Sequence, residues 1–147
     1  MFFETYGLIG LFFASFLAAT ILPFSSEAVL TFFLLNGVDP WVCLAIATIG
    51  NSLGGCTNYF IGKMGTTRWL LRIGIKEHQI QQKENWFIKY GNWLAFFSWL
   101  PIIGDPLMVV LGYFKSPVMK TLTTMVIGKL LRYLFIIWGV QLLKLYF

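Results

Sequence analysis

Two proline breaks inside apolar runs constrain the fold of this chain more than any other feature. Segments 22–27 and 100–105 both begin Leu-Pro, and each has a carboxylate four residues after the proline, Glu27 in the first and Asp105 in the second. Pro23 and Pro101 each remove a backbone donor and crowd the preceding turn, so each breaks a helix. A carboxylate at the centre of a bilayer costs about 3 kcal/mol on insertion scales, so its presence calls for a function or a partner.

The composition is that of a membrane protein. Of the 147 residues, 58% are hydrophobic and 12% are charged, whereas soluble domains carry about 25% charged residues. The mean hydropathy is +0.75. We therefore expect one integral membrane domain over residues 1–147.

The basic residues indicate the orientation in the membrane. Segment 63–92 contains only two acids, and its cations are Lys63, Arg68, Arg72, Lys76, Lys83 and Lys89. Short loops rich in Lys and Arg stay in the cytoplasm, so this basic, amphipathic segment is predicted to be cytoplasmic. Because these charges flank membrane segments, we expect anionic lipid headgroups as their partner, not nucleic acid.

The lengths of the apolar runs predict two re-entrant hairpins. The run 27–36 holds about ten residues and ends in a turn at 36–40, whereas crossing a bilayer takes about 20 residues. Residues 7–36 therefore read as two arms that return to the side they entered from, and residues 93–112 repeat the pattern around Pro101. Residues 41–62 and 118–146 read as full spans.

The two halves align at a constant offset of 78 residues. The matched pairs are Leu22/Leu100, Pro23/Pro101, Glu27/Asp105, Leu44/Leu122, Ile49/Ile127 and Gly50/Gly128. Each half holds one hairpin and one span, so each crosses the membrane once and the second copy must be inverted. The predicted fold is an all-α integral membrane protein with inverted repeats at 1–62 and 93–147, each a re-entrant helical hairpin plus a transmembrane helix.

Four charged residues are candidates for the chemistry. A desolvated carboxylic acid favours its neutral form, so Glu27 and Asp105 are predicted to carry protons. Lys129 and Arg132 lie three residues apart in the middle of the last span, hence on one helix face. Their expected partners are the two acids or an anionic ligand, because Arg binds phosphate through a planar fork and Lys acts as a point charge. Permanent ion pairing is the alternative.

A stripe of small and polar residues follows the helix predicted at 41–62. Asn51 and Asn58 lie on it with Gly55 and Gly62, and close helix packing explains the glycines. Asn51 is the more functional candidate because it is opposite Lys129 in the repeat. The adjacent Gly50 and Gly54 form a GxxxG step that favours close helix packing. Because two spans and two hairpins barely enclose a cavity, and this step offers a packing surface, we expect a homodimer.

The chain lacks the common catalytic motifs. It contains no HExxH, GxSxG, Walker loop or CxxC sequence, so nothing in it supports an ATPase, a metalloprotease or a serine hydrolase. We predict no enzymatic activity, no metal site and no cofactor.

Four motifs of the chain resemble the DedA superfamily, also called SNARE-associated or VTT-domain proteins, and most closely its YqaA-like branch. They are the segments 22–27, 50–55, 98–105 and 128–133. The resemblance implies a multi-pass protein of the bacterial inner membrane with two oppositely oriented re-entrant hairpins. It also implies proton-driven transport of undecaprenyl phosphate or other phospholipids. Eukaryotic relatives in the superfamily scramble lipids.

The chain departs from the family pattern at the second hairpin. Typical members carry arginines on both sides of the second hairpin proline, and these positions read Ser98 and Gly104 here. Arg132 and Lys129 are the residues that could supply the missing positive charge.

The sequence thus predicts a transporter or scramblase that moves an anionic lipid past Arg132 and Lys129, with Glu27 and Asp105 responding to protons. Two alternatives remain open. One is a transporter of small ions or cationic compounds that uses Glu27 as a cation site. The other is a membrane assembly or regulatory protein with a permanently ion-paired centre.

Overall fold

The computed structural model describes residues 2–20, 25–65, 67–72, 74 and 76–147, and every regular element in these ranges is helical. The elements in order are α1 (Phe2–Thr20), α2 (Ser25–Leu35), α3 (Pro40–Met64), α4 (Thr67–Arg72), α5 (Glu77–Phe96), η1 (Phe97–Trp99), α6 (Gly104–Tyr113) and α7 (Val118–Tyr146). An all-helical fold was predicted and is observed.

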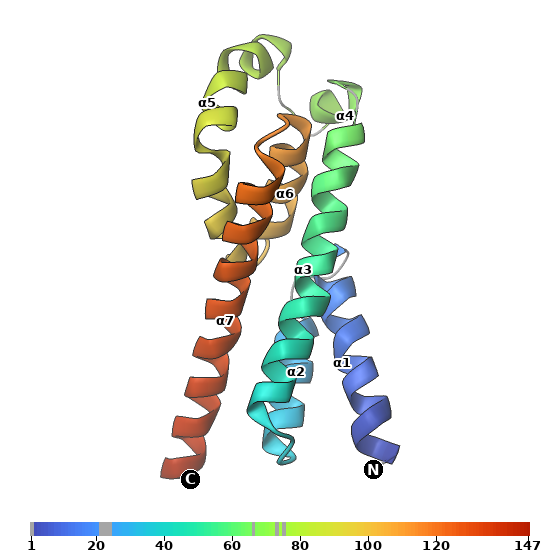
Figure 1. Ribbon diagram of the computed structural model, residues 1–147, viewed down its shortest axis with the longest axis vertical. Coiled ribbons are helices and arrows are strands. Elements are labelled where there is room, and N and C mark those ends of the chain that lie inside the picture. The colour runs from blue at the N-terminus through green and yellow to red at the C-terminus, as the bar shows by residue number, and fades with distance from the viewer. Residues whose placement is uncertain (1, 21–24, 66, 73, 75) are drawn as a thin grey trace.

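Two long helices carry two helical pairs at opposite ends of the molecule (Figure 1). Helices α3 and α7 run most of its length. Helix α1 rises from the end at which both termini lie, and α2 returns to that same end. Helices α5 and α6 make the corresponding descent and return from the other end, so the inner ends of both pairs lie near the middle of the molecule.

Helix α3 begins at a well-defined cap. The Asp39 carboxylate accepts hydrogen bonds from the backbone N–H groups of Trp41 (2.8 Å) and Val42 (3.1 Å), and Pro40 occupies the first turn. Proline suits that position because its missing N–H would have no helical partner there. Just before it, Gly37 adopts φ +83°, a conformation that glycine tolerates best. This sequence turns the chain sharply from α2 into α3.

The second proline break is visible in the backbone. Leu100, which precedes Pro101, is extended (φ −65°, ψ 128°), as the proline ring requires of its neighbour. Ile102 then adopts φ +73°, which is rare for a β-branched residue. The chain reverses here between η1 and α6. The first predicted break, at Pro23, lies outside the described residues.

Glycines let α3 pack closely on α6. A Cβ at Gly62 would overlap the Val109 carbonyl, and one at Gly112 would overlap the Tyr59 carbonyl, so each helix presents a glycine to the backbone of the other. The Gly50-Gly54 step is used in the same way against α1. This step therefore packs within the chain, and the predicted homodimer stays a prediction that does not draw on it.

Of the helices in the described ranges, α7 alone is both long and apolar enough to cross a membrane on length and composition. Helix α3 has 25 residues, but its hydropathy is lowered by the polar stripe that contains Asn51, Ser52 and Asn58. All three side chains are buried against neighbouring helices. The low hydropathy of α3 thus reflects a face that contacts protein.

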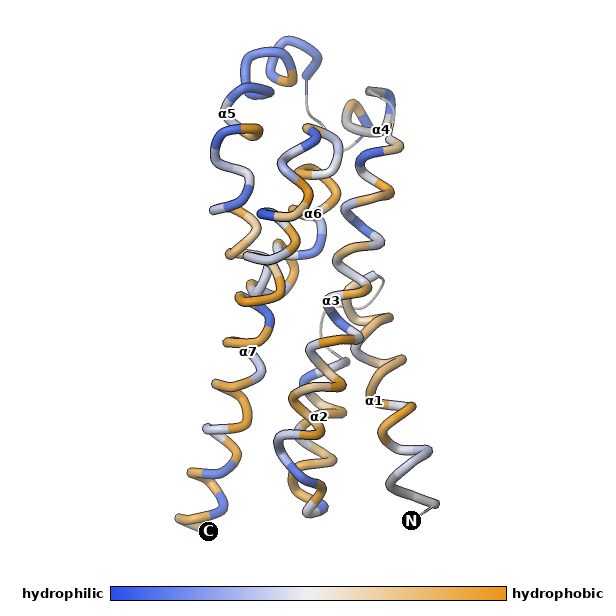
Figure 2. The backbone as a smooth tube through the Cα atoms, viewed as in Figure 1, coloured by the Kyte–Doolittle hydropathy of each residue, from blue (hydrophilic) through white to orange (hydrophobic). Residues whose placement is uncertain are grey.

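Helix α5 joins two segments that the sequence analysis separated at residue 92. It is continuous from Glu77 to Phe96, and its outer part is the most hydrophilic region of the tube in Figure 2. The Phe87 ring stacks on Phe114 at the end of α6, with centroids 4.4 Å apart and planes 4° from parallel. Ile80 is buried in the same cluster. The amphipathic segment therefore packs on α6 as part of the second helical pair.

The α3–α6 contact gives a matched prediction about glycine. We expect Gly62→Ala to destabilise the protein by about 1–3 kcal/mol, because its new methyl group would displace the backbone of α6. Gly139→Ala is the control, since a Cβ there meets nothing, and it should be neutral or stabilising by up to about 1 kcal/mol. Unfolding in mixed micelles measures both; equal effects would contradict the packing described.

Candidate functional site

Four charged side chains meet where the inner ends of the two helical pairs approach α7. Glu27 lies in the first turn of α2 and Asp105 in the first turn of α6. Lys129 and Arg132 lie one turn apart near the middle of α7. A helix N-terminus favours negative charge, so both acids occupy positions where the helix itself stabilises a carboxylate. The sequence prediction singled out these four residues, and the structure brings them together.

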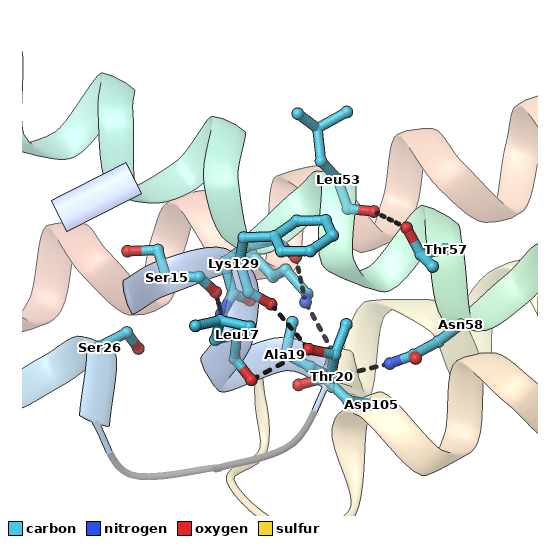
Figure 3. Close-up of polar contacts among 12 residues, drawn as sticks. Ser15, Leu17, Ala19, Thr20, Ser26, Leu53, Thr57, Asn58, Asp105 and Lys129 are labelled. Atoms are coloured by element: carbon cyan, nitrogen blue, oxygen red, sulfur yellow. Dashed lines mark hydrogen bonds and ion pairs between the residues drawn. The ribbon is translucent and has the colours of Figure 1, made fainter. Parts of the chain in front are cut away.

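The Asp105–Lys129 pair is largely buried. The Lys129 ammonium lies 2.8 Å from the Asp105 carboxylate and donates a second hydrogen bond, of 2.9 Å, to the Asn51 carbonyl of α3 (Figure 3). The Lys129 side chain is 0% exposed and that of Asp105 is 19% exposed. Gly55, one turn after Asn51, leaves space for the Met125 sulfur and the Lys129 ammonium. This pair joins α3, α6 and α7.

The Glu27–Arg132 pair is more open. Arg132 donates from Nε to a Glu27 carboxylate oxygen at 2.8 Å, and its Nη2 atom contacts the same oxygen. The Arg132 side chain is 9% exposed, but that of Glu27 is 36% exposed. Next to them, the buried Tyr133 hydroxyl lies 3.2 Å from the Ser26 hydroxyl. The pair thus joins α2 to α7 while remaining accessible from one side.

A pocket of about 500 Å³ opens onto this second pair. Its charged lining residues are Glu27 and Arg132, and the rest of the lining is Phe96, Trp99, Pro101, Gly128, Leu131, Phe135 and Ile136. Phe135 is 69% exposed, so the pocket opens sideways to the surroundings of the helices. Lys129 and Asp105 are not among the lining residues. The pocket combines an apolar wall with a single arginine–carboxylate pair.

The two predicted asparagines hold the inner end of α1 instead of facing the pocket. Asn58 donates from Nδ2 to the Ala19 carbonyl at 2.7 Å, and Asn51 donates to the Ser15 carbonyl at 3.0 Å. Carbonyls in the last turn of a helix have no partner within it, so Asn58 acts as a cap for α1. Figure 3 shows Asn58 reaching this helix end. The polar stripe of α3 therefore stabilises the end of α1.

The two positions that lack the family arginines touch each other. The Ser98 side chain is buried, and a Cβ at Gly104 would overlap the Ser98 carbonyl. The start of α6 is thus packed directly on η1, and no long side chain lies between them. Positive charge reaches this region from α7.

Sequence reasoning missed the wall of the pocket and its hydroxyl neighbours. Phe96, Trp99 and Phe135 belong to runs so rich in aromatics that no spacing marks them as a lining. Tyr133 and Ser26 were quoted only within motifs, although their adjacency to Arg132 and Glu27 in the sequence was a usable indication.

Comparison with known proteins gives consistent matches. The family model described as the VTT domain matches residues 22–142. Inner membrane protein YqaA of Escherichia coli is 37% identical over 135 residues, which are 88% of each chain. An uncharacterised protein of Haemophilus influenzae is 31% identical over 140 residues, 90% of this chain and 86% of its own.

A more distant relative has a functional name. Undecaprenyl phosphate transporter A of Bacillus subtilis is 30% identical over 100 residues, which cover 64% of this chain and 50% of its own. No solved structure matched the chain.

The different burial of the two ion pairs predicts different costs of breaking them. Lys129→Gln leaves a largely buried carboxylate without its cation, so we expect a loss of about 3–5 kcal/mol in unfolding free energy. Adding Asp105→Asn should restore part of that loss, because the unpaired charge is removed. Glu27→Gln should cost less than Lys129→Gln, because the Arg132 guanidinium that it leaves unpaired borders an open pocket. Equal costs for the two single variants would show that the pairs are equivalent.

Proposed function

The chain belongs to the VTT-domain family of the DedA superfamily, on its YqaA-like branch, and from this premise we propose that it is a small transporter or scramblase of the bacterial inner membrane. Its substrate is an anionic lipid such as a polyprenyl phosphate or a phospholipid. Two relatives support the proposal through their names, one an inner membrane protein and the other a transporter of undecaprenyl phosphate.

In the proposed topology, α3 and α7 cross the membrane, and the pairs α1/α2 and α5/α6 are re-entrant hairpins that enter from opposite faces. The end that carries the basic segment 63–92 lies in the cytoplasm. Helix bounds support the repeat. Helix α2 begins at Ser25, and the 78-residue offset carries this position to residue 103, one residue before α6 begins. Helix α3 begins at Pro40, and the offset carries this position to residue 118, where α7 begins. Helices α1, α2, α5 and α6 each extend along only part of the molecule (Figure 1).

The observation that carries the proposal is an arginine in the middle of an apolar helix that faces an open apolar pocket. A lipid phosphate offers the charge and acceptors that the Arg132 guanidinium recognises, and the aromatic wall suits the adjoining hydrocarbon. In the structure, the Arg132 guanidinium is paired with the Glu27 carboxylate. Phosphate binding therefore exchanges one anion for another at Arg132, which avoids burying an unpaired charge.

The same exchange links lipid binding to protons. When the Glu27 carboxylate takes up a proton, its attraction to the guanidinium falls and Arg132 is released for a phosphate. When the phosphate leaves, Glu27 loses the proton and pairs again. Asp105 is the second proton-responsive acid in this scheme, and Lys129 adds positive charge behind Arg132.

Removal of the arginine tests the anion site. We expect Arg132→Gln to slow translocation of a fluorescent phosphatidylglycerol in proteoliposomes by about tenfold or more, because charge-assisted hydrogen bonds contribute about 1.5–3 kcal/mol. Arg132→Lys should retain part of the rate. Lys120→Gln, an exposed lysine near the start of the same helix, is the control. Wild-type rates in Arg132→Gln would refute an anion site at Arg132.

Removal of the acids tests proton coupling. Glu27→Gln mimics the protonated acid, so translocation by this variant should no longer respond to a pH gradient across the vesicle membrane. Asp105→Asn should weaken the response as well. If both variants transport as fast as the wild type and respond equally to the gradient, neither acid carries a proton in the cycle.

A further inference from the structure

Three further cavities continue from the pocket along α7. A cavity of about 220 Å³ shares Leu131 and Phe135 with the pocket, and the next, of about 160 Å³, shares Leu134 and Trp138 with that cavity. A last cavity of about 230 Å³ shares Gln141 with its neighbour and ends at Lys144. We call this row of cavities the α7 furrow.

The middle of the α7 furrow is apolar, and a cation lies at each of its ends. Its middle is lined by large apolar side chains, among which Phe135 and Trp138 are 69% and 61% exposed. Arg132 marks one end and Lys144 the other. Twelve residues separate them, so the furrow is about 18 Å long, close to the roughly 15 Å of one leaflet's hydrocarbon.

The outer end of the furrow has the chemistry of a headgroup site. The Lys144 ammonium donates one hydrogen bond to the Leu34 carbonyl at the end of α2. An ammonium has three donors, so this contact leaves two for another acceptor. Gln141, one turn earlier, lines both outer cavities. Asp39, the acid that lies in sequence beside the lining residues Val38 and Pro40, accepts hydrogen bonds from the first turn of α3.

We propose that the α7 furrow binds one anionic phospholipid of the leaflet at the end where both termini lie. The lipid phosphate contacts Lys144 and Gln141, and one hydrocarbon chain lies along Phe135 and Trp138 toward Arg132. Trp41 lines an outer cavity and is 72% exposed. Tryptophans in membrane proteins prefer the level of the lipid headgroups, which is where this lipid would place its phosphate.

This inference rests on the proposed function in one respect: the bound lipid is a source of substrate for Arg132. A lipid in the furrow needs to advance its headgroup along one face of α7 to reach the guanidinium. Lys144 is then a specificity-determining residue that favours anionic over zwitterionic lipids at entry.

Photo-crosslinking in nanodiscs tests the furrow separately from transport. The probe is phosphatidylglycerol with a diazirine on one acyl chain, in a phosphatidylcholine background, and peptide mass spectrometry locates the adducts. We expect adducts on residues 131–141 to exceed those at Ile127, an exposed position of the same helix outside the furrow. Lys144→Gln should lower this excess several-fold, Lys144→Arg should restore it, and Lys120→Gln should leave it unchanged.

Several outcomes overturn the inference. They are adducts spread evenly over the exposed residues of α7, an excess that Lys144→Gln does not change, and equal labelling by a phosphatidylcholine probe. Translocation and furrow adducts are both measured in the wild type and in Arg132→Gln, which separates this inference from the proposed function. If the wild-type protein forms furrow adducts but does not translocate lipid, only the transport proposal is refuted. If it translocates lipid without forming furrow adducts, only the furrow is refuted.

Discussion

The structure depends on neutralising two cations in the middle of an apolar helix. Lys129 and Arg132 lie one turn apart on α7, and their side chains are 0% and 9% exposed. Each receives one carboxylate, and each carboxylate lies in the first turn of a short helix that begins after a break. The start of a short helix presents both an acid and free backbone N–H groups to α7, which an uninterrupted helix could not do.

The two ion pairs are chemically similar but differ in their surroundings. The ammonium of Lys129 contacts Asp105 and the Asn51 carbonyl and lies close to Gly55, so this pair ties three helices together. Arg132 faces an open pocket and shares it with a partly exposed Glu27. One pair is therefore suited to hold the structure, and the other is suited to exchange its anion.

Much of this arrangement could be predicted from the sequence, because prolines and buried charges obey strong local rules. Pro101, the turn before Pro40 and the four charged residues each have a meaning that does not depend on packing. The continuity of α5 across residue 92 was not visible in the sequence, because this single helix is polar at its outer end and apolar at its inner end. The close packing predicted at Gly50 is observed, and its partner is α1. A GxxxG step shows that a helix packs closely, but not on which partner.

The central claim is that the polar centre lies within the membrane between hairpins that enter from opposite faces. Single cysteines at Val38 and Lys115, on a background with Cys43 and Cys56 replaced by alanine, test it most directly. A membrane-impermeant maleimide added to intact spheroplasts should label position 38, and position 115 only after permeabilisation. Labelling of both positions from the same face would contradict the claim.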